Sequence, residues 1–145
     1  MSKLEPEPQY GQDDASFRAA GGQEGIEHLV DAFYDHMERL PEARAIRAMH
    51  PQDLTEARRK LSFFLSGWLG GPRRYAEHYG PISIPRVHAH LAVDADARDA
   101  WLLCMEKAIA EQPFEPAFAA YLLAALGVPA ERVRIICARQ DEPPA

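Results

Sequence analysis

The sequence predicts an all-α domain, because apolar residues recur at helical spacing, turn-forming residues separate these segments, and no segment alternates in the manner of a strand. The stretch 23–40 carries the clearest apolar stripe, and the stretch 51–69 carries a second one that glycines and a proline end. At 145 residues the chain is long enough for one hydrophobic core. We therefore expect one domain over 15–139, after a flexible polar arm at 1–14 and before a tail at 140–145.

Glycines, prolines and capping residues divide the chain into a series of helices. The residue before a proline avoids the helical region, so His50-Pro51 is expected to form a corner. Asp94 or Asp96 is expected to cap the helix that carries Trp101, and Gly127-Val128-Pro129 is expected to interrupt the last helix. The expected helical segments are 15–20, 23–40, 43–49, 51–69, 73–79, a short piece near 88, a segment ending near 112, 117–126 and 130–138.

Helical spacing also predicts which side chains point inward. Tyr10 is the one large apolar residue of the arm and is expected to hold it against the domain. Tyr34 is expected at the edge of the stripe in 23–40. That stripe consists of Ile26, Leu29, Val30, Phe33 and Met37, and the water-facing residues of the next long helix are expected to be Glu56, Arg58, Arg59 and Lys60.

Composition disfavours some classes of partner. A net charge of −6 argues against nucleic acid or an anionic membrane as the main partner, because both favour basic surfaces. No apolar run is long enough to span a membrane, and the N-terminus does not resemble a signal peptide. Cys104 and Cys137 lie among apolar residues, so we expect buried thiols in a reducing compartment and a cytoplasmic location.

His88 and His90 form the most informative pair among the six histidines. On a strand both would face one side and could share a metal ion, whereas on a helix they diverge by roughly 200°. Because no carboxylate or cysteine stands nearby at ligand spacing, a zinc site is disfavoured. A single inward-pointing histidine could still bind the iron of a haem.

A haem pocket also needs apolar walls and a few polar groups across the ring. The helix expected at 51–69 supplies walls, and three separate segments supply groups that can donate hydrogen bonds. Taken singly, each of these polar residues is more often a core residue than part of a site. The candidate walls are Leu61, Phe64 and Leu65, and the candidate polar residues are Tyr34, His50 and Trp101.

Several runs of this chain resemble the group II truncated haemoglobins, whose shortened globin fold packs two helices over two. The resemblance covers about 21–126, and the two longest runs, together with a histidine thirteen residues before the tryptophan, make a highly specific combination. The matching runs are Gly21-Gly22, Phe33-Tyr34, 50–54 (HPQDL), 64–72 (FLSGWLGGP) followed by Tyr75, and His88 ten residues before 98–105 (RDAWLLCM).

The resemblance implies a role for each matching residue. His88, rather than His90, corresponds to the proximal ligand of haem b (iron protoporphyrin IX), whose iron is then pentacoordinate or weakly hexacoordinate. Tyr34, His50 and Trp101 correspond to the distal residues that surround the bound gas and offer it hydrogen bonds. The other expected haem-pocket residues are Phe33, Ala57, Lys60, Leu61, Phe64, Leu65, Tyr75, Arg86, Leu91 and Met105.

Some of these pocket residues carry a more specific implication. Lys60 and Tyr75 match positions that often reach the haem propionates, where a cation or a hydroxyl suits a carboxylate. Ala57 matches a position where a small residue leaves ligand entry less obstructed. Leu91 stands where the family usually has phenylalanine, and Arg86 is the basic residue that is left before the histidine.

The function implied by the resemblance is the binding of dioxygen, and of CO, NO or peroxide, as in oxygen transport or storage. Hydrogen bonds to the partly negative ligand slow its release. The alternative is a haem enzyme for nitric-oxide dioxygenation or peroxidase-like chemistry, which needs an external reductase because no flavin or nicotinamide domain is recognised. A haem-free helical interaction or sensor module is a third class, which a haem absorption band would exclude. We expect a monomer or a homodimer.

Overall fold

The structure is a computed structural model, and it describes residues 10–80 and 93–141, with side chains up to Ala138. Within these residues the secondary structure is helical and contains no strand, as the sequence predicts. The described helices are α1 (Ala15–Ala19), α2 (Gly22–Arg39), the 3-10 turn η1 (Pro41–Ala43), α3 (Arg44–Ala48), α4 (Thr55–Trp68), α5 (Arg74–Tyr79), α7 (Ala95–Ala110) and α8 (Pro116–Asp141).

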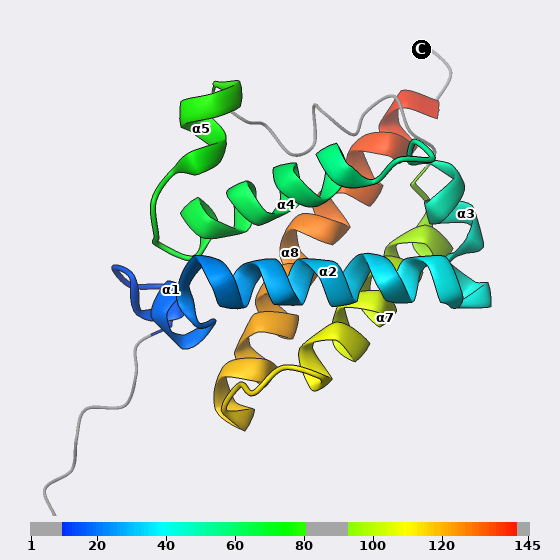
Figure 1. The fold of residues 1–145 in the computed structure, drawn as a ribbon. Coiled ribbons are helices and arrows are strands. Elements are labelled where there is room, and N and C mark those ends of the chain that lie inside the picture. Colours follow the sequence, from blue (N-terminus) through cyan, green and yellow to red (C-terminus); the bar gives the residue numbers. More distant parts are fainter. Residues whose placement is uncertain (1–9, 81–92, 142–145) are drawn as a thin grey trace, which may run out of the picture.

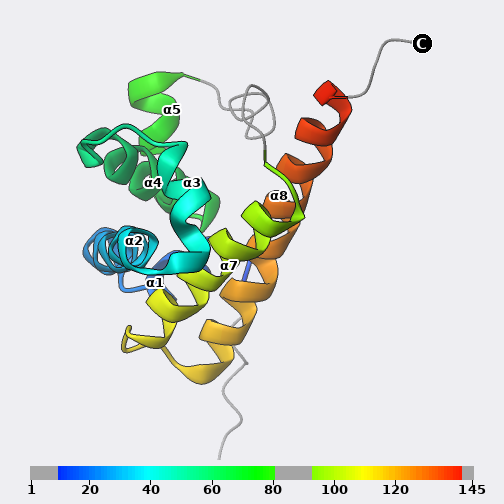
Figure 2. The same cartoon turned by 90° about the vertical axis from the view of Figure 1, so that its right-hand side faces the viewer.

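The four long helices form two layers. Helices α2 and α4 lie side by side in one layer, and α7 and α8 lie together in the other (Figure 1). Seen along α2, the second layer crosses beside the first, and α2 contacts both α4 and α7 (Figure 2). This is the arrangement of two helices over two that the sequence analysis predicts.

The core is built on the apolar stripe of α2. The five residues predicted for this stripe are all buried, with exposed fractions of 0 to 1%. Burying each of these side chains contributes about 1.5–3 kcal/mol to folding. Tyr34, predicted at the edge of the stripe, is also buried. The fully buried residues that the other layer contributes include Cys104, Met105, Phe118, Leu122 and Leu126.

Helix α4 begins at Thr55, later than the start near Pro51 that the sequence predicts. The reason is that side chains occupy the backbone groups of the preceding turn. Arg47 donates to the carbonyls of Pro51 (3.0 Å) and Gln52 (2.9 Å), and the Asp53 carboxylate accepts the N–H of Thr55 at 2.9 Å. The corner predicted at His50-Pro51 is therefore present and extends by three residues.

Helix α7 is capped by Asp94, whose Oδ1 accepts the N–H of Ala97 at 2.8 Å, so the first of the two predicted caps is correct. The predicted interruption of the last helix is wrong, because α8 runs through Pro129 without a break. Proline removes one backbone hydrogen bond, but Val133 and Cys137 beyond it remain buried. The burial of these two side chains favours continuation of α8 past the proline.

Charged side chains join the beginning of α7 to the second half of α8. Arg98 Nη1 contacts Glu131 Oε1 at 2.9 Å, and Arg134 pairs with the same carboxylate. These hydrogen bonds, first from Arg134 and then from Arg98, lower the pKa of Glu131 to about 2. The ion pairs give a second reason why α8 continues past the proline.

The N-terminal part of the described chain packs on the ends of the long helices. The Tyr10 ring lies 5.2 Å from the rings of both Phe118 and Tyr121, so the predicted attachment of the arm is confirmed. After α4, Gly70 adopts a φ of +92°, and a Cβ there would meet the Asp13 carbonyl oxygen at 1.8 Å. Only glycine allows this close approach without strain.

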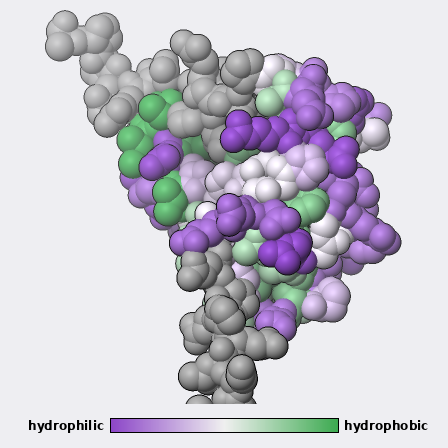
Figure 3. All heavy atoms as spheres, turned by 90° about the vertical axis from the view of Figure 1, so that its left-hand side faces the viewer, coloured by the Kyte–Doolittle hydropathy of each residue, from purple (hydrophilic) through white to green (hydrophobic). Residues whose placement is uncertain are grey.

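The face that carries α1 and α5 is mostly polar (Figure 3). Seen from the side of α1 and α5, hydrophilic side chains dominate, and apolar ones form smaller groups between them (Figure 3). None of the helices described is both long and apolar enough to cross a membrane. Cys104 and Cys137 are both buried, as predicted, and burial raises the pKa of the Cys104 thiol to about 11.

Candidate functional site

Tyr34 is the most unusual polar side chain in the described core. It lies on α2 with 5% of its surface exposed, and its hydroxyl donates to the carbonyl of Ala57 on α4 at 3.5 Å. That distance is well beyond the usual range for O–H···O hydrogen bonds, so the bond is weak. Burial raises the pKa of Tyr34 to about 12, and the positive charge of Arg58 partly opposes this rise. The phenol therefore stays protonated at neutral pH and keeps a donor that is only weakly engaged.

His50 lies next to Tyr34, although the two are sixteen positions apart in the sequence. The two rings are 5.7 Å apart and nearly perpendicular, at 79°. His50 Nδ1 lies 2.8 Å from the carbonyl oxygen of Ile46. Because a carbonyl oxygen only accepts, Nδ1 must carry a proton, and in the neutral ring Nε2 then carries a lone pair.

Trp101 reaches the same region from α7. It is half-buried, and its ring centre lies 5.1 Å from the ring of Phe33. Phe33 also packs edge-on against Tyr34 at 4.9 Å. The structure therefore brings Tyr34 and His50 into contact and connects Trp101 to them through Phe33.

The predicted wall residues fall into two groups. Leu65 and Met105 are completely buried in the core. Ala57, Leu61 and Phe64 are only partly buried, and Trp68 continues their row along α4. Their positions follow the i, i+4, i+7, i+11 pattern that places residues along one face of a helix. We call Ala57, Leu61, Phe64 and Trp68 the apolar row of α4.

Lys60 and Tyr75, expected near haem propionates, both lie against Tyr79. Lys60 Nζ is 5.4 Å from the centre of the Tyr79 ring, and the Tyr75 ring is 4.9 Å from the same ring. The Tyr79 hydroxyl donates to Glu56 at 2.5 Å, which connects α5 to α4. The structure thus places both predicted residues at the contact between these two helices.

The predicted proximal ligand His88, its competitor His90, and the pocket residues Arg86 and Leu91 lie outside the described residues. Their roles stay predictions.

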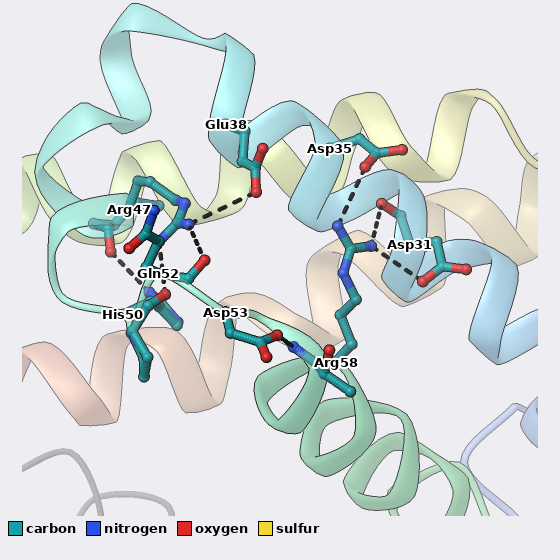
Figure 4. Close-up of polar contacts among 11 residues, drawn as sticks. Asp31, Asp35, Glu38, Arg47, His50, Gln52, Asp53 and Arg58 are labelled. Atoms are coloured by element: carbon teal, nitrogen blue, oxygen red, sulfur yellow. Dashed lines mark hydrogen bonds and ion pairs between the residues drawn. The ribbon is translucent and has the colours of Figure 1, made fainter.

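The polar contacts that surround Tyr34 and His50 were not predicted from the sequence. Arg58, predicted to face water, instead turns toward α2 and is half-buried. Arg47 holds the carbonyls of the corner that follows His50 and also lies 3.7 Å from Glu38 on α2 (Figure 4). The one available signal was the acidic pair Asp31 and Asp35, one helical turn apart on the polar side of α2.

Comparisons with known proteins identify the family and the fold. The family model described as bacterial-like globin matches residues 15–130. The group 2 truncated hemoglobin YjbI of Bacillus subtilis (strain 168) is 36% identical over 88 residues, which are 61% of this chain. The same residues are 64% of that relative, so the match spans less than two thirds of its length.

Solved structures match over most of their length. The group II 2-on-2 hemoglobin from the plant pathogen Agrobacterium tumefaciens is 30% identical with a TM-score of 0.79, covering 90% of this chain and 98% of that one. The truncated oxygen-avid haemoglobin from Bacillus subtilis is 31% identical with a TM-score of 0.75, covering 81% and 97%. The truncated globin fold predicted from the sequence is therefore confirmed.

A globin fold implies a haem, and the described residues fit one. The apolar row of α4 is only partly covered by other side chains, although burying such groups is favourable. A flat and mostly apolar ring would cover this row. The weakly bonded hydroxyl of Tyr34 contacts the backbone carbonyl of Ala57, the first residue of the row.

Proposed function

Because this chain belongs to the bacterial-like globin family, we propose that it is a haem protein that binds dioxygen and other small diatomic ligands reversibly. The observation that carries this proposal is the buried, protonated and weakly bonded phenol of Tyr34 beside the apolar row of α4. The oxygen avidity named for the Bacillus subtilis structure is a property of that protein, and it supports the proposal for this one.

Haem b would lie along the apolar row of α4, with His88 as the proximal ligand. When bound, this group supplies an iron that takes up dioxygen, CO or NO. The row excludes water from that side of the ring, and Ala57 leaves room beside Tyr34 because its side chain is small. Lys60 and Tyr75 are proposed to contact the propionates at the rim.

Tyr34 is proposed as the main hydrogen-bond donor to the ligand. A pKa near 12 keeps its proton in place across the physiological pH range. Its bond to the Ala57 carbonyl is long, so turning the hydroxyl toward a ligand gives up little energy. Trp101 is proposed as the second donor, because an indole N–H donates and cannot accept.

His50 is proposed to act differently from these two residues. Its Nδ1 proton is directed at the Ile46 carbonyl, so the neutral ring has a lone pair rather than a proton at Nε2. In that form His50 accepts a hydrogen bond and cannot donate one to a ligand from Nε2. We therefore assign ligand hydrogen bonding to Tyr34 and Trp101, with His50 packed edge-on against the phenol to restrict its position.

Absorption spectra test the haem part of the proposal. The purified protein should show an intense haem band in ferric, ferrous and CO-bound forms, and His88→Ala should lose the haem or change its coordination. The matched variant His90→Ala should retain the wild-type spectra. A wild-type protein reconstituted with haem that shows no specific band would contradict the proposal.

The rate of oxygen release tests the proposal that Tyr34 and Trp101 donate hydrogen bonds to the ligand. Losing one hydrogen bond to a charged group costs about 1.5–3 kcal/mol, which corresponds to release about ten to a hundred times faster. We expect this increase for Tyr34→Phe, and a smaller one in the same direction for Trp101→Phe. Unchanged release rates in both variants would exclude this assignment of donors.

A further inference from the structure

Arg58 joins the beginning of α4 to α2 through three contacts. Its Nη1 donates to Asp31 Oδ1 at 3.1 Å and to the Asp31 carbonyl at 3.2 Å, and its Nη2 donates to Asp35 Oδ1 at 3.3 Å. The two aspartates are one helical turn apart, and the planar guanidinium spans them (Figure 4). This geometry specifies how α4 sits on α2 at this point.

Tyr34 lies between the two aspartates in the sequence, and Arg58 also packs against it. The guanidinium carbon is 5.6 Å from the centre of the Tyr34 ring. The residue before Arg58 is Ala57, whose carbonyl accepts the Tyr34 hydroxyl. One turn of α4 therefore contacts both the ring and the hydroxyl of the phenol.

We propose that Arg58 is a positioning residue for the distal donor Tyr34, and that it keeps the phenol hydroxyl at the start of the apolar row of α4. This inference rests on the proposed function, because it assigns a ligand-binding role to Tyr34. The guanidinium restricts the ring directly and, through Asp31 and Asp35, holds the α4 backbone that accepts the hydroxyl.

A purely stabilising role would explain these contacts less well. The side chains of Asp31 and Asp35 are 60% and 53% exposed, and ion pairs with such exposed partners contribute little to stability. The position of a hydrogen-bond donor, by contrast, is sensitive to small displacements, since a shift of about 1 Å strongly weakens a directed contact. Removing Arg58 should therefore affect ligand binding more than folding.

The test uses Arg58→Gln and Arg58→Lys in the haem-loaded protein, with Arg59→Gln as the matched control. Arg59 is the neighbouring arginine on α4, but it is exposed and lies over the rings of Phe63 and Tyr79. We expect Arg58→Gln to release oxygen roughly three to ten times faster and to shift the C–O stretching frequency of the CO complex toward that of Tyr34→Phe. Arg58→Lys should show a partial effect, because an ammonium cannot span both aspartates. Arg59→Gln should match the wild type.

A double variant separates positioning from a general loss of structure. If Arg58 acts through Tyr34, then Arg58→Gln should have no further effect on oxygen release in a Tyr34→Phe background. An equal effect in both backgrounds, or a wild-type release rate and stretching frequency in Arg58→Gln, would overturn the inference.

A measurement independent of ligand release distinguishes failure of the inference from failure of the proposed function. In the CO-saturated protein with isotope-labelled tyrosine, the Tyr34 ring resonances should shift in Arg58→Gln and stay unchanged in Arg59→Gln. If Tyr34→Phe does not alter oxygen release, the donor role of Tyr34 is refuted. The inference about Arg58 is then refuted as well, even if the resonances shift. If Tyr34→Phe does alter release while the resonances stay unchanged in Arg58→Gln, only the role of Arg58 is refuted.

Discussion

Replacing Tyr34 by phenylalanine should make the protein more stable and, at the same time, make it release oxygen faster. The phenol is buried, with 5% of its surface exposed, and its hydroxyl has one described partner at 3.5 Å. Leaving a buried hydroxyl poorly paired costs about 1–3 kcal/mol, while a bond at this length returns only a fraction of the usual 0.5–1.5 kcal/mol. Tyr34→Phe keeps the shape of the ring and removes the poorly paired atom.

We therefore expect the free energy of unfolding to rise by about 0.5–1.5 kcal/mol in Tyr34→Phe, while oxygen is released about ten to a hundred times faster. Urea unfolding of the ferric haem-loaded protein measures the first quantity, and stopped-flow displacement of oxygen by CO measures the second. A site that gains stability when a functional group is removed is typical of a residue kept for function.

Tyr79→Phe is the matched control, because it also removes a hydroxyl from a tyrosine. The Tyr79 hydroxyl donates to Glu56 at 2.5 Å near the surface, so its loss should lower the free energy of unfolding by up to about 1 kcal/mol and leave oxygen release unchanged. A loss of more than about 1 kcal/mol of stability in Tyr34→Phe would show that the Tyr34 hydroxyl is well bonded in the protein and would contradict its role as a weakly engaged donor.

Three further predictions concern the frame around the site. Glu131→Gln should weaken the dependence of the free energy of unfolding on acid pH. The pKa of Glu131 is lowered to about 2, so the stabilisation by its carboxylate is complete above the ordinary pKa near 4.5 and is lost as the pH falls toward 2. Unfolding curves of both proteins across this pH range measure the difference. Pro129→Ala should raise the melting temperature, because proline inside a helix removes a backbone hydrogen bond and its ring clashes with the preceding turn, at a combined cost of up to about 3 kcal/mol relative to alanine. A lower melting temperature would show that proline suits this position. Arg47→Gln should lower the free energy of unfolding by about 1–2 kcal/mol and speed hydrogen exchange at residues 50–54, because the carbonyls of Pro51 and Gln52 lose their donor. Unchanged hydrogen exchange at these residues would show that Arg47 does not stabilise the corner.

Local patterns were sufficient for most of the helices. The stripe of α2, the cap at Asp94 and the turn after α4 depend on residues within a few positions of one another, so they could be predicted from the sequence. The resemblance to the truncated haemoglobins also singled out Tyr34, His50 and Trp101, and the structure brings the first two into contact.

Contacts between helices could not be predicted in the same way. Helical periodicity placed Arg58 in water, but two acidic residues on α2 hold it half-buried against Tyr34. The glycine and proline in α8 predicted a break, but the buried side chains and ion pairs that follow keep the helix continuous. Both outcomes depend on partners that are distant in sequence.

The sequence by itself determined that this chain forms helices with an apolar stripe, where most of their turns lie, and which family they resemble, because these features depend on neighbouring residues and on motifs. Only the tertiary structure decided that the Tyr34 phenol is buried with a weak partner, that His50 directs its Nδ1 proton at a backbone carbonyl, and that Arg58 turns inward. The physical reason is that burial and the choice of hydrogen-bond partner are set by the side chains that a second helix brings into contact.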